Sequence, residues 1–263
     1  MKTRILSGIV LGVITVSSLL IGGIYMFCIC LAISIVGMSE YYKVVGLQKN
    51  ILGIIGYISA VSCYAYLFAG HSEILLFCLI ISAMAMLAAY VLTFPGTGID
   101  DVVKAFWGII YVPVMLSYIY QTRMMEHGEY MAWLIFICSW GNDTFAYFTG
   151  VLFGKHKLAP KLSPKKTIEG AIGGIVGASA VGAIFGFLIK AYVGRDMTIV
   201  FAIASAIGAI VAVFGDLAAS AVKRNYNVKD YGKIIPGHGG ILDRYDSVIF
   251  TAPIIYWVLY FIS

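Results

Sequence analysis

Long runs of apolar residues, separated by short polar segments, follow one another along almost the whole chain. Each run has the length of roughly 20 residues that an α-helix needs to cross the hydrocarbon core of a bilayer. Such segments must be helical, because unpaired backbone N–H and C=O groups are not tolerated in lipid. The pattern predicts an all-α, polytopic integral membrane protein with about nine transmembrane helices. The predicted spans lie near residues 5–21, 23–39, 51–70, 74–94, 103–120, 130–152, 168–190, 198–219 and 247–263.

The composition supports a membrane environment. Of the 263 residues, 61% are hydrophobic and only 12% are charged, whereas about a quarter of a soluble domain is charged. So few charged groups cannot cover this much apolar surface in water. The five cysteines all lie within apolar runs and are typical of small core residues. These observations exclude a secreted disulfide-rich domain, a disordered chain and an ordinary soluble enzyme.

Lysine and arginine are distributed unevenly between the two sides of the membrane. With nine spans, all but three of the 18 basic residues fall on the N-terminal side, and the exceptions are Arg123, Lys190 and Arg195. Cytoplasmic loops carry an excess of lysine and arginine. We therefore predict that the N-terminus and the two basic loops of the second half are cytoplasmic.

We expect one functional unit with two regions. Residues 1–130 contain about five spans and mostly generic membrane sequence. Residues 131–263 contain about four spans, the basic cytoplasmic loops and nearly all of the unusual polar residues. The seventh span also carries a small residue at every fourth position, which is typical of close helix packing: Gly174, Ala178, Gly182 and Gly186.

A polar pair interrupts the sixth predicted span. Asn142 and Asp143 lie within it, where a carboxylate costs about 3 kcal/mol on insertion scales. Two explanations are open. The pair either forms a hydrogen-bond cluster between helices or lines a polar site within the membrane.

The basic loop before the seventh span ends in the segment 163–167, Ser-Pro-Lys-Lys-Thr. Serine followed by proline is typical of a helix N-cap and first helical position, so we expect Lys165 and Lys166 in the first turn of a helix. Lysines there are unfavourable unless they share an anion with the free N–H groups. The pattern favours a phosphate site, and the alternative is a loop that only sets membrane topology.

The most distinctive region begins at the end of the eighth span. Asp216, Ser220 and Lys223 fall on one face if that helix continues. Asp243 and Asp246 follow a glycine-rich segment, and they share a face if the last helix begins there. Aspartates at two span ends, joined by a loop that can approach a ligand closely, predict a metal–phosphate site.

Asp216, Asp243 and Asp246 are the candidate ligands, because magnesium prefers carboxylate oxygens. The basic residues around them supply enough charge for a polyphosphate: Lys223, Arg224, Lys229, Lys233 and Arg244. The alternative is that these charges only form salt bridges with one another. His238, between glycines and a proline, could contact a phosphate, transfer a proton or order the loop.

This region closely resembles the signature of the phosphatidate cytidylyltransferase family, the CDP-diacylglycerol synthases. That signature runs from a serine, through Lys-Arg and Lys-Asp pairs and a Pro-x-His-Gly-Gly turn, to an Asp-Arg-x-Asp ending. The matching residues, with the family's spacing, are Ser220, Lys223, Arg224, Lys229, Asp230, Pro236, His238, Gly239, Gly240, Asp243, Arg244 and Asp246. Segments 142–144 and 163–167 are also similar to the family, whereas residues 1–130 match only in being hydrophobic and of suitable length.

The resemblance implies a membrane enzyme that transfers CMP from CTP to phosphatidic acid, giving CDP-diacylglycerol and pyrophosphate. It implies Mg²⁺ at the aspartates that match Asp216 and Asp243, together with a second cation that need not be magnesium. It further implies a homodimer in the lipid bilayer of the cell (inner or plasma) membrane, with its active site on the cytoplasmic side. Nucleic acid is not an expected partner.

The resemblance and the charge pattern together assign roles to the candidate residues. The catalytic set is Asp216, Asp243, Asp246, Lys223 and His238. The substrate-binding set is Asn142, Asp143, Lys165, Lys166, Ser220, Arg224, Lys229 and Arg244. His238 receives no proton-transfer role, because phosphatidate already carries an ionised nucleophile.

Two other functions fit part of the sequence. In a cation-coupled transporter or channel, Asp143 and Asp216 would form an ion site within the membrane. The sequence has no internal repeat, however, and the glycine-rich turn would have no evident task in transport. A related CTP-dependent enzyme could act on another lipid, such as an archaeal ether lipid or a polyprenol, and the sequence does not distinguish these acceptors.

Overall fold

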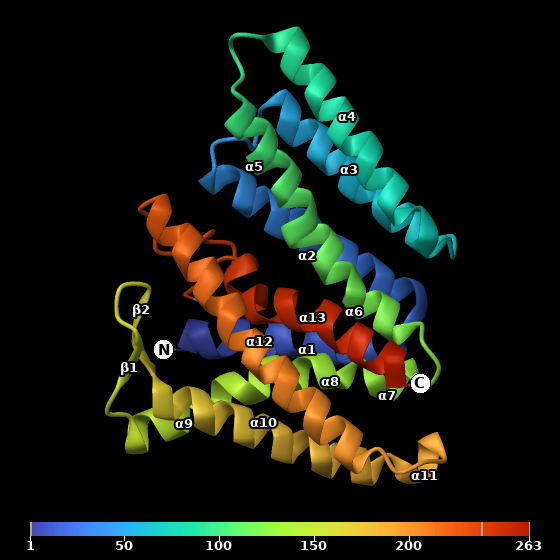
Figure 1. The fold of residues 1–263 in the computed structure, drawn as a ribbon, viewed down its shortest axis with the longest axis vertical. Coiled ribbons are helices and arrows are strands. Elements are labelled where there is room, and N and C mark those ends of the chain that lie inside the picture. Colours follow the sequence, from blue (N-terminus) through green and yellow to red (C-terminus); the bar gives the residue numbers. More distant parts are fainter. Residues whose placement is uncertain (1, 238, 263) are drawn as a thin grey trace. The chain divides into compact units, whose positions relative to one another are not determined.

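The computed structural model of the chain is largely helical and describes residues 2–237 and 239–262 (Figure 1). It forms two compact units. The first consists of Met1–Ser117 and Tyr226–Arg244, and the second of Tyr118–Asn225 and Tyr245–Ser263. The loop that follows the eighth predicted span, Tyr226–Arg244, therefore folds with the N-terminal helices. The two regions predicted from the sequence, 1–130 and 131–263, group this loop with the C-terminal spans instead.

Helices α1 to α5 build most of the first unit. The bounds are α1 Lys2–Ile21, α2 Gly23–Val44, α3 Ile51–Phe68, the 3-10 turn η1 Ser72–Ile74, α4 Leu75–Thr93, α5 Ile99–Ile109 and the π-helical turn η2 Ile110–Val114. The next helix, α6 Met115–Arg123, begins in the first unit and continues into the second. Asn50 caps α3, because its side-chain oxygen accepts the N–H of Leu52 (3.1 Å). α3 packs against both α4 and α5 (Figure 1).

Hydroxyl groups are buried between the helices of the first unit. Tyr42 and Tyr64 are fully buried. The Tyr42 hydroxyl donates to the carbonyl oxygen of Ala105 (2.7 Å), and the Tyr64 hydroxyl shares a hydrogen bond with Ser34 (2.7 Å). Apolar side chains such as Ile58 are exposed instead. In a bilayer such exposed groups contact lipid, while the paired hydroxyls link neighbouring helices.

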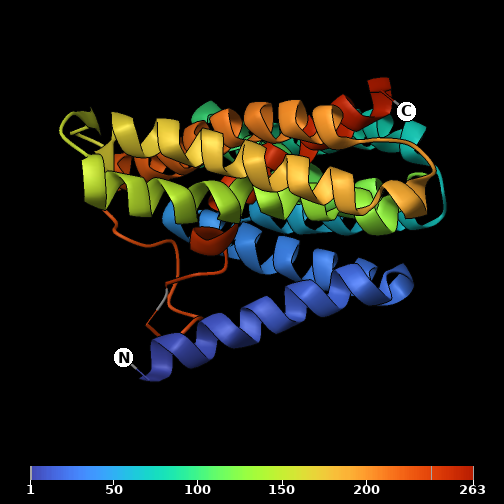
Figure 2. The same cartoon turned by 90° about the horizontal axis from the view of Figure 1, so that it is seen from below.

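The second unit contains a short hairpin as well as helices. The bounds are α7 Gly128–Met131, α8 Trp133–Phe136, the π-helical turn η3 Ile137–Gly141, α9 Asn142–Phe153, β1 Lys157–Ala159, β2 Ser163–Thr167, α10 Ile168–Leu188, α11 Lys190–Val193, α12 Thr198–Asn225 and α13 Leu242–Ile262. β1 and β2 pair in an antiparallel hairpin. Figure 2 shows α9, α10 and α12 running side by side.

α10 packs closely against both α9 and α12 (Figures 1 and 2). The small residues at every fourth position of α10 are all buried: Gly174, Ala178, Gly182 and Gly186. Ser179 adds a hydrogen bond between helices by donating to the carbonyl oxygen of Ala202 (2.9 Å). Small side chains let helix backbones approach each other in a membrane. The close packing predicted from this spacing is confirmed.

Replacing Gly182 by leucine is expected to destabilise the second unit by about 1–3 kcal/mol, the usual cost of overpacking. A Cβ atom there would collide with the Ser205 hydroxyl and the Phe201 carbonyl oxygen. The thermal unfolding midpoint of the purified protein in detergent measures the effect. Gly12→Leu is the matched control, because a Cβ on Gly12 meets no atom of the described chain within 4 Å. Equal midpoints for the two variants would contradict close packing at Gly182.

Among the described residues, seven helices are long and apolar enough to cross a membrane. They correspond to the predicted spans other than the first and the sixth. The apolar part of α1, Ser7–Ile21, is shorter, and the sixth predicted span is divided among α7, α8, η3 and α9. The chain is therefore a helical protein with seven candidate membrane spans, and the count of nine stays a prediction.

The prediction that Ser163 is a helix N-cap and Pro164 the first helical residue is wrong. The segment Ser163–Thr167 forms strand β2, and α10 begins only at Ile168. Thr167 provides the cap instead, because its Oγ1 accepts the N–H of Gly170 (3.1 Å). Pairing with β1 keeps the segment extended. The two lysines of this segment therefore lie on a hairpin and not in the first turn of a helix.

Candidate active site

Three carboxylates gather in the second unit, from Asp143 on α9, Asp216 on α12 and Asp246 on α13. Asp246 lies within electrostatic range of both other carboxylates, and Asp143 lies within range of Asp216. The side chains of Asn142 and Ser247 lie close to Asp143. Like charges held together in this way are unfavourable unless cations lie close by.

Two lysines supply compensating positive charge. Lys166 on β2 forms an ion pair with Asp216, and Lys223 lies within electrostatic range of Asp246. The Ser220 hydroxyl donates to Asp216 Oδ1 (3.4 Å), and α12 continues through Lys223, so the predicted shared helix face is confirmed. Carboxylates and ammonium groups placed this closely can hold a cation and an anion next to each other.

A pocket of about 410 Å³ opens at this cluster. The charged part of its wall consists of Asp143, Lys165, Lys166 and Asp216. Tyr147, Val151 and Leu158 are among the residues of its apolar part. Tyr147 and Val151 are also exposed on the outside of α9, so the apolar wall continues onto the apolar surface of the unit. The pocket can therefore accept an anionic group and an attached apolar group together.

The loop Tyr226–Arg244 of the first unit folds around Asp243. This side chain is 7% exposed, and its Oδ2 accepts the backbone N–H groups of Tyr231 (2.8 Å) and Gly240 (2.9 Å). Burial raises the pKa of the Tyr231 phenol well above its usual value. One carboxylate thus joins two points of the loop that are nine residues apart in the sequence.

A tight turn and a basic pocket lie within the same loop. The N–H of Ile235 donates to the carbonyl oxygen of Gly239 (2.9 Å). Gly237 (φ 77°) and Gly239 (φ 87°) adopt a backbone conformation that favours glycine. The charged residues that line the pocket, which measures about 550 Å³, are Lys229, Asp230, Lys233 and Arg244. Three cations against one carboxylate suit a polyanionic ligand.

Sequence reasoning missed Glu40, a buried carboxylate of α2 that also contacts this loop. Glu40 is 4% exposed, and it accepts the N–H groups of Ile241 (3.1 Å) and Leu242 (2.8 Å). The sequence offered one signal, which is a carboxylate directly after the apolar run 23–39. It gave no indication of the partners, which lie 201 and 202 residues away along the chain.

The predicted site residues are distributed over both units. The second unit contains Asn142, Asp143, Lys165, Lys166, Asp216, Ser220, Lys223, Arg224 and Asp246. The first unit contains Lys229, Asp243 and Arg244. The prediction for His238 lies outside the described residues.

Within residues 2–237 and 239–262, no three His, Cys, Asp or Glu side chains are grouped closely enough to hold a metal ion. The assignment of Asp216, Asp243 and Asp246 as metal ligands therefore stays a prediction.

The seven candidate membrane helices fit a multi-pass membrane protein, and carboxylates and lysines cluster in its second unit. Residues 2–262 match the model of the cytidylyltransferase family. The chain belongs to this family.

Several relatives from bacteria cover almost the whole chain, and each carries the name phosphatidate cytidylyltransferase. The protein from Staphylococcus saprophyticus is 32% identical over 260 residues, which is 97% of both chains. That from Staphylococcus haemolyticus is 34% identical over 263 residues, again 97% of both chains. That from Bacillus subtilis is 32% identical over 274 residues, covering 98% of this chain and 97% of the relative.

Proposed function

We propose that this protein is a CTP:phosphatidate cytidylyltransferase, which transfers CMP from CTP to phosphatidic acid and releases pyrophosphate. The observation that carries this conclusion is the family match over residues 2–262, together with full-length relatives of that name. The carboxylate–lysine cluster and its partly apolar pocket support a reaction between an anionic lipid and a nucleotide.

The reaction joins two anions. A phosphate oxygen of phosphatidate attacks the α-phosphorus of CTP, and the bond from that phosphorus to the bridging oxygen of the β-phosphate breaks. The enzyme must therefore reduce repulsion between the substrates, align the attacking oxygen and neutralise the departing pyrophosphate. Because phosphatidate is already ionised, no strong general base is required.

We assign Lys165 and Lys166 to the headgroup of phosphatidate. Both line the pocket of the second unit, where their ammonium groups offer partners for a phosphate. Tyr147 and Val151 provide apolar surface in the same pocket and on the outside of α9. A lipid could thus place its phosphate at the lysines while its chains remain in an apolar environment.

We assign the basic pocket of the first unit to the triphosphate of CTP. Lys229, Lys233 and Arg244 line that pocket, and their charges suit the polyphosphate part of a nucleotide. Lys223 and Arg224, in the last turn of α12, are proposed as further cations for the same substrate.

Magnesium is proposed at the aspartate cluster from the chemistry of its donors, although the three carboxylates are not grouped closely enough to hold a metal ion in the part of the chain that the structure describes. Asp143, Asp216 and Asp246 offer the carboxylate oxygens that Mg²⁺ prefers, and their mutual repulsion favours a bound cation. Bound magnesium would neutralise part of the charge of the reacting phosphates. Asp243 is also proposed as a metal ligand, on the family resemblance. The same resemblance supports a second bound cation, which need not be magnesium.

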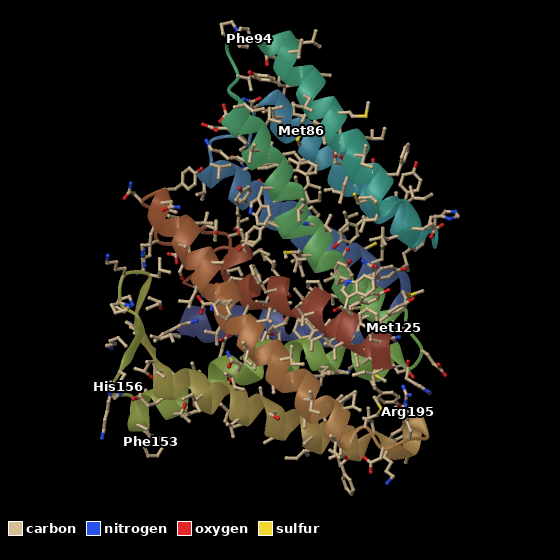
Figure 3. All side chains as sticks on the ribbon, in the orientation of Figure 1. Met86, Phe94, Met125, Phe153, His156 and Arg195 are labelled. Atoms are coloured by element: carbon tan, nitrogen blue, oxygen red, sulfur yellow. The ribbon has the colours of Figure 1, made fainter. Side chains whose placement is uncertain are left out.

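We further propose nine membrane crossings, with the N-terminus and the active site on the cytoplasmic side of the cell membrane. In the second unit, His156, which directly precedes the β1–β2 hairpin, lies toward one end, while Met125 and Arg195 lie toward the other (Figure 3). This separation is the one expected if the hairpin faces the cytoplasm and the loops near Arg123 and Arg195 do not. The proposed homodimer rests on the family resemblance alone.

Lys166→Ala is expected to raise the KM for phosphatidate roughly tenfold, because a charge-assisted contact to the headgroup is lost. The KM for CTP should change much less. Initial rates in mixed micelles, with the lipid given as a surface fraction, measure both constants. Lys157→Ala removes an exposed lysine from the same hairpin and is the matched control. Identical kinetics for the two variants would remove Lys166 from the proposed headgroup site.

The proposed function is tested by following labelled CTP into a lipid-extractable product, using the purified protein. Product formation should require phosphatidate and magnesium, and UTP or GTP should not replace CTP. Ether lipids and polyprenyl phosphates are tested side by side as alternative acceptors. Folded protein that forms no product with any of these lipids would contradict a cytidylyltransferase and favour the transporter.

A further inference from the structure

Glu40 lies near the C-terminal end of α2, far along the chain from every predicted site residue. Its side chain is 4% exposed, and a buried carboxylate is unfavourable unless it has hydrogen-bond partners. Oε1 accepts the N–H of Ile241 (3.1 Å), and Oε2 accepts the N–H of Leu242 (2.8 Å). Each carboxylate oxygen is therefore used by a backbone donor.

These donors lie at the N-terminus of α13, which begins at Leu242. A helix N-terminus has N–H groups without intrahelical partners and carries a positive partial charge. The capping side chain usually comes from the residue just before the helix. Here it comes from α2, so Glu40 fixes where the backbone of α13 starts. It thereby fixes the positions of Asp243 and Arg244 in the first turn.

Two loop glycines pack against the same carboxylate. A Cβ atom on Gly240 would collide with both oxygens of Glu40, and one on Gly232 would collide with Oε1. Gly240 also donates its N–H to Asp243 (2.9 Å). The loop backbone is thus packed between the carboxylate of α2 and the first turn of α13, without space for larger residues.

The loop that Glu40 holds contains the basic pocket. Gly232 contributes both to the wall of this pocket and to the packing around Glu40. The cations of the pocket lie on either side of Gly232 in the sequence or at the start of α13: Lys229, Lys233 and Arg244. A change in the loop backbone would therefore alter the spacing of all three cations.

We propose that Glu40 is a positioning residue, which holds the loop Tyr226–Arg244 in the conformation that binds the triphosphate of the nucleotide. The part of this inference that concerns the nucleotide rests on the proposed function. The part that concerns the loop does not, and it can be tested without any turnover.

Tryptic cleavage after Lys233, which is exposed, reports how well the loop is held in the folded protein. In Glu40→Gln the NH₂ group of the amide faces one of the two backbone N–H groups, so one of the two hydrogen bonds is lost. Cleavage of the less tightly held loop should therefore be roughly tenfold faster than in the unmodified protein. The KM for CTP should rise by a similar factor, while the KM for phosphatidate stays unchanged. Gly240→Ala, which pushes a methyl group against Glu40, should produce the same pattern with the carboxylate still present.

Tyr42→Phe is the matched control. Tyr42 is also buried on α2, and its hydroxyl donates to the carbonyl oxygen of Ala105 (2.7 Å). The phenylalanine variant loses this hydrogen bond, which does not involve the loop. It should change neither the cleavage rate nor the KM for CTP. Unchanged cleavage in both Glu40→Gln and Gly240→Ala would overturn the inference, as would equal rises in the two KM values. If the unmodified protein shows no transferase activity, the proposed function fails, and the cleavage rates still decide whether Glu40 holds the loop.

Discussion

Asp216→Asn is expected to lower kcat for CDP-diacylglycerol formation about a thousandfold, the upper range for losing one electrostatic contact in an active site. Asparagine has nearly the same size and can still accept the hydrogen bond from Ser220. It removes the negative charge that pairs with Lys166 and that contributes to the cluster with Asp143 and Asp246. The measurement is the initial rate at saturating CTP, phosphatidate and magnesium.

Asp196→Asn provides the matched control for this variant. Asp196 also forms an ion pair with a lysine, Lys190 (2.9 Å), and it lies just before the same helix, α12. Its replacement should leave kcat unchanged, because its carboxylate is exposed and lies outside the pocket. A loss of less than tenfold in Asp216→Asn would remove Asp216 from the reacting centre. Thermal unfolding of both variants shows whether any loss reflects folding.

Asp243→Asn and Asp243→Ala are both expected to abolish turnover, but only the alanine variant should disturb the loop. Asn can still accept the N–H groups of Tyr231 and Gly240 through its amide oxygen, whereas alanine leaves both buried donors without this acceptor. Each unsatisfied buried donor costs about 1–3 kcal/mol. Turnover measures the need for the carboxylate charge, and tryptic cleavage after Lys233 measures the order of the loop.

Asp100→Asn is the control for the Asp243 variants, since Asp100 is an exposed aspartate in the first turn of another helix, α5. It should change neither turnover nor cleavage. Near-normal turnover in Asp243→Asn would show that Asp243 orders the loop without contributing its charge to the reaction. That result would also remove Asp243 from the proposed magnesium ligands.

The helices were predictable because their determinants are local. An apolar run either is long enough to cross a bilayer or is not, and lipid requires its backbone to be helical. The glycine stripe of α10 and the shared face of Asp216, Ser220 and Lys223 follow from helical periodicity in the same way. The signature residues of the second half were equally visible, because they lie within one short stretch of sequence.

The hairpin before α10 shows where local rules fail. Serine followed by proline favours a helix start, but the pairing of β2 with β1 keeps that segment extended and moves the cap to Thr167. Strand pairing depends on a partner segment, and no property of the Ser-Pro pair reveals it. The position of Lys165 and Lys166 on a hairpin therefore could not be derived from their immediate neighbours.

The sequence by itself determined the class of this protein, most of its candidate membrane helices, its family and the candidate residues for its chemistry. The tertiary structure decided which of those residues meet. It gathered Asp143, Asp216 and Asp246 from three helices and brought Glu40 to the start of α13. Burial of a carboxylate requires hydrogen-bond partners, and for Glu40 these lie more than 200 residues away along the chain. Only the folded chain brings such partners together, since no periodic pattern links positions so far apart.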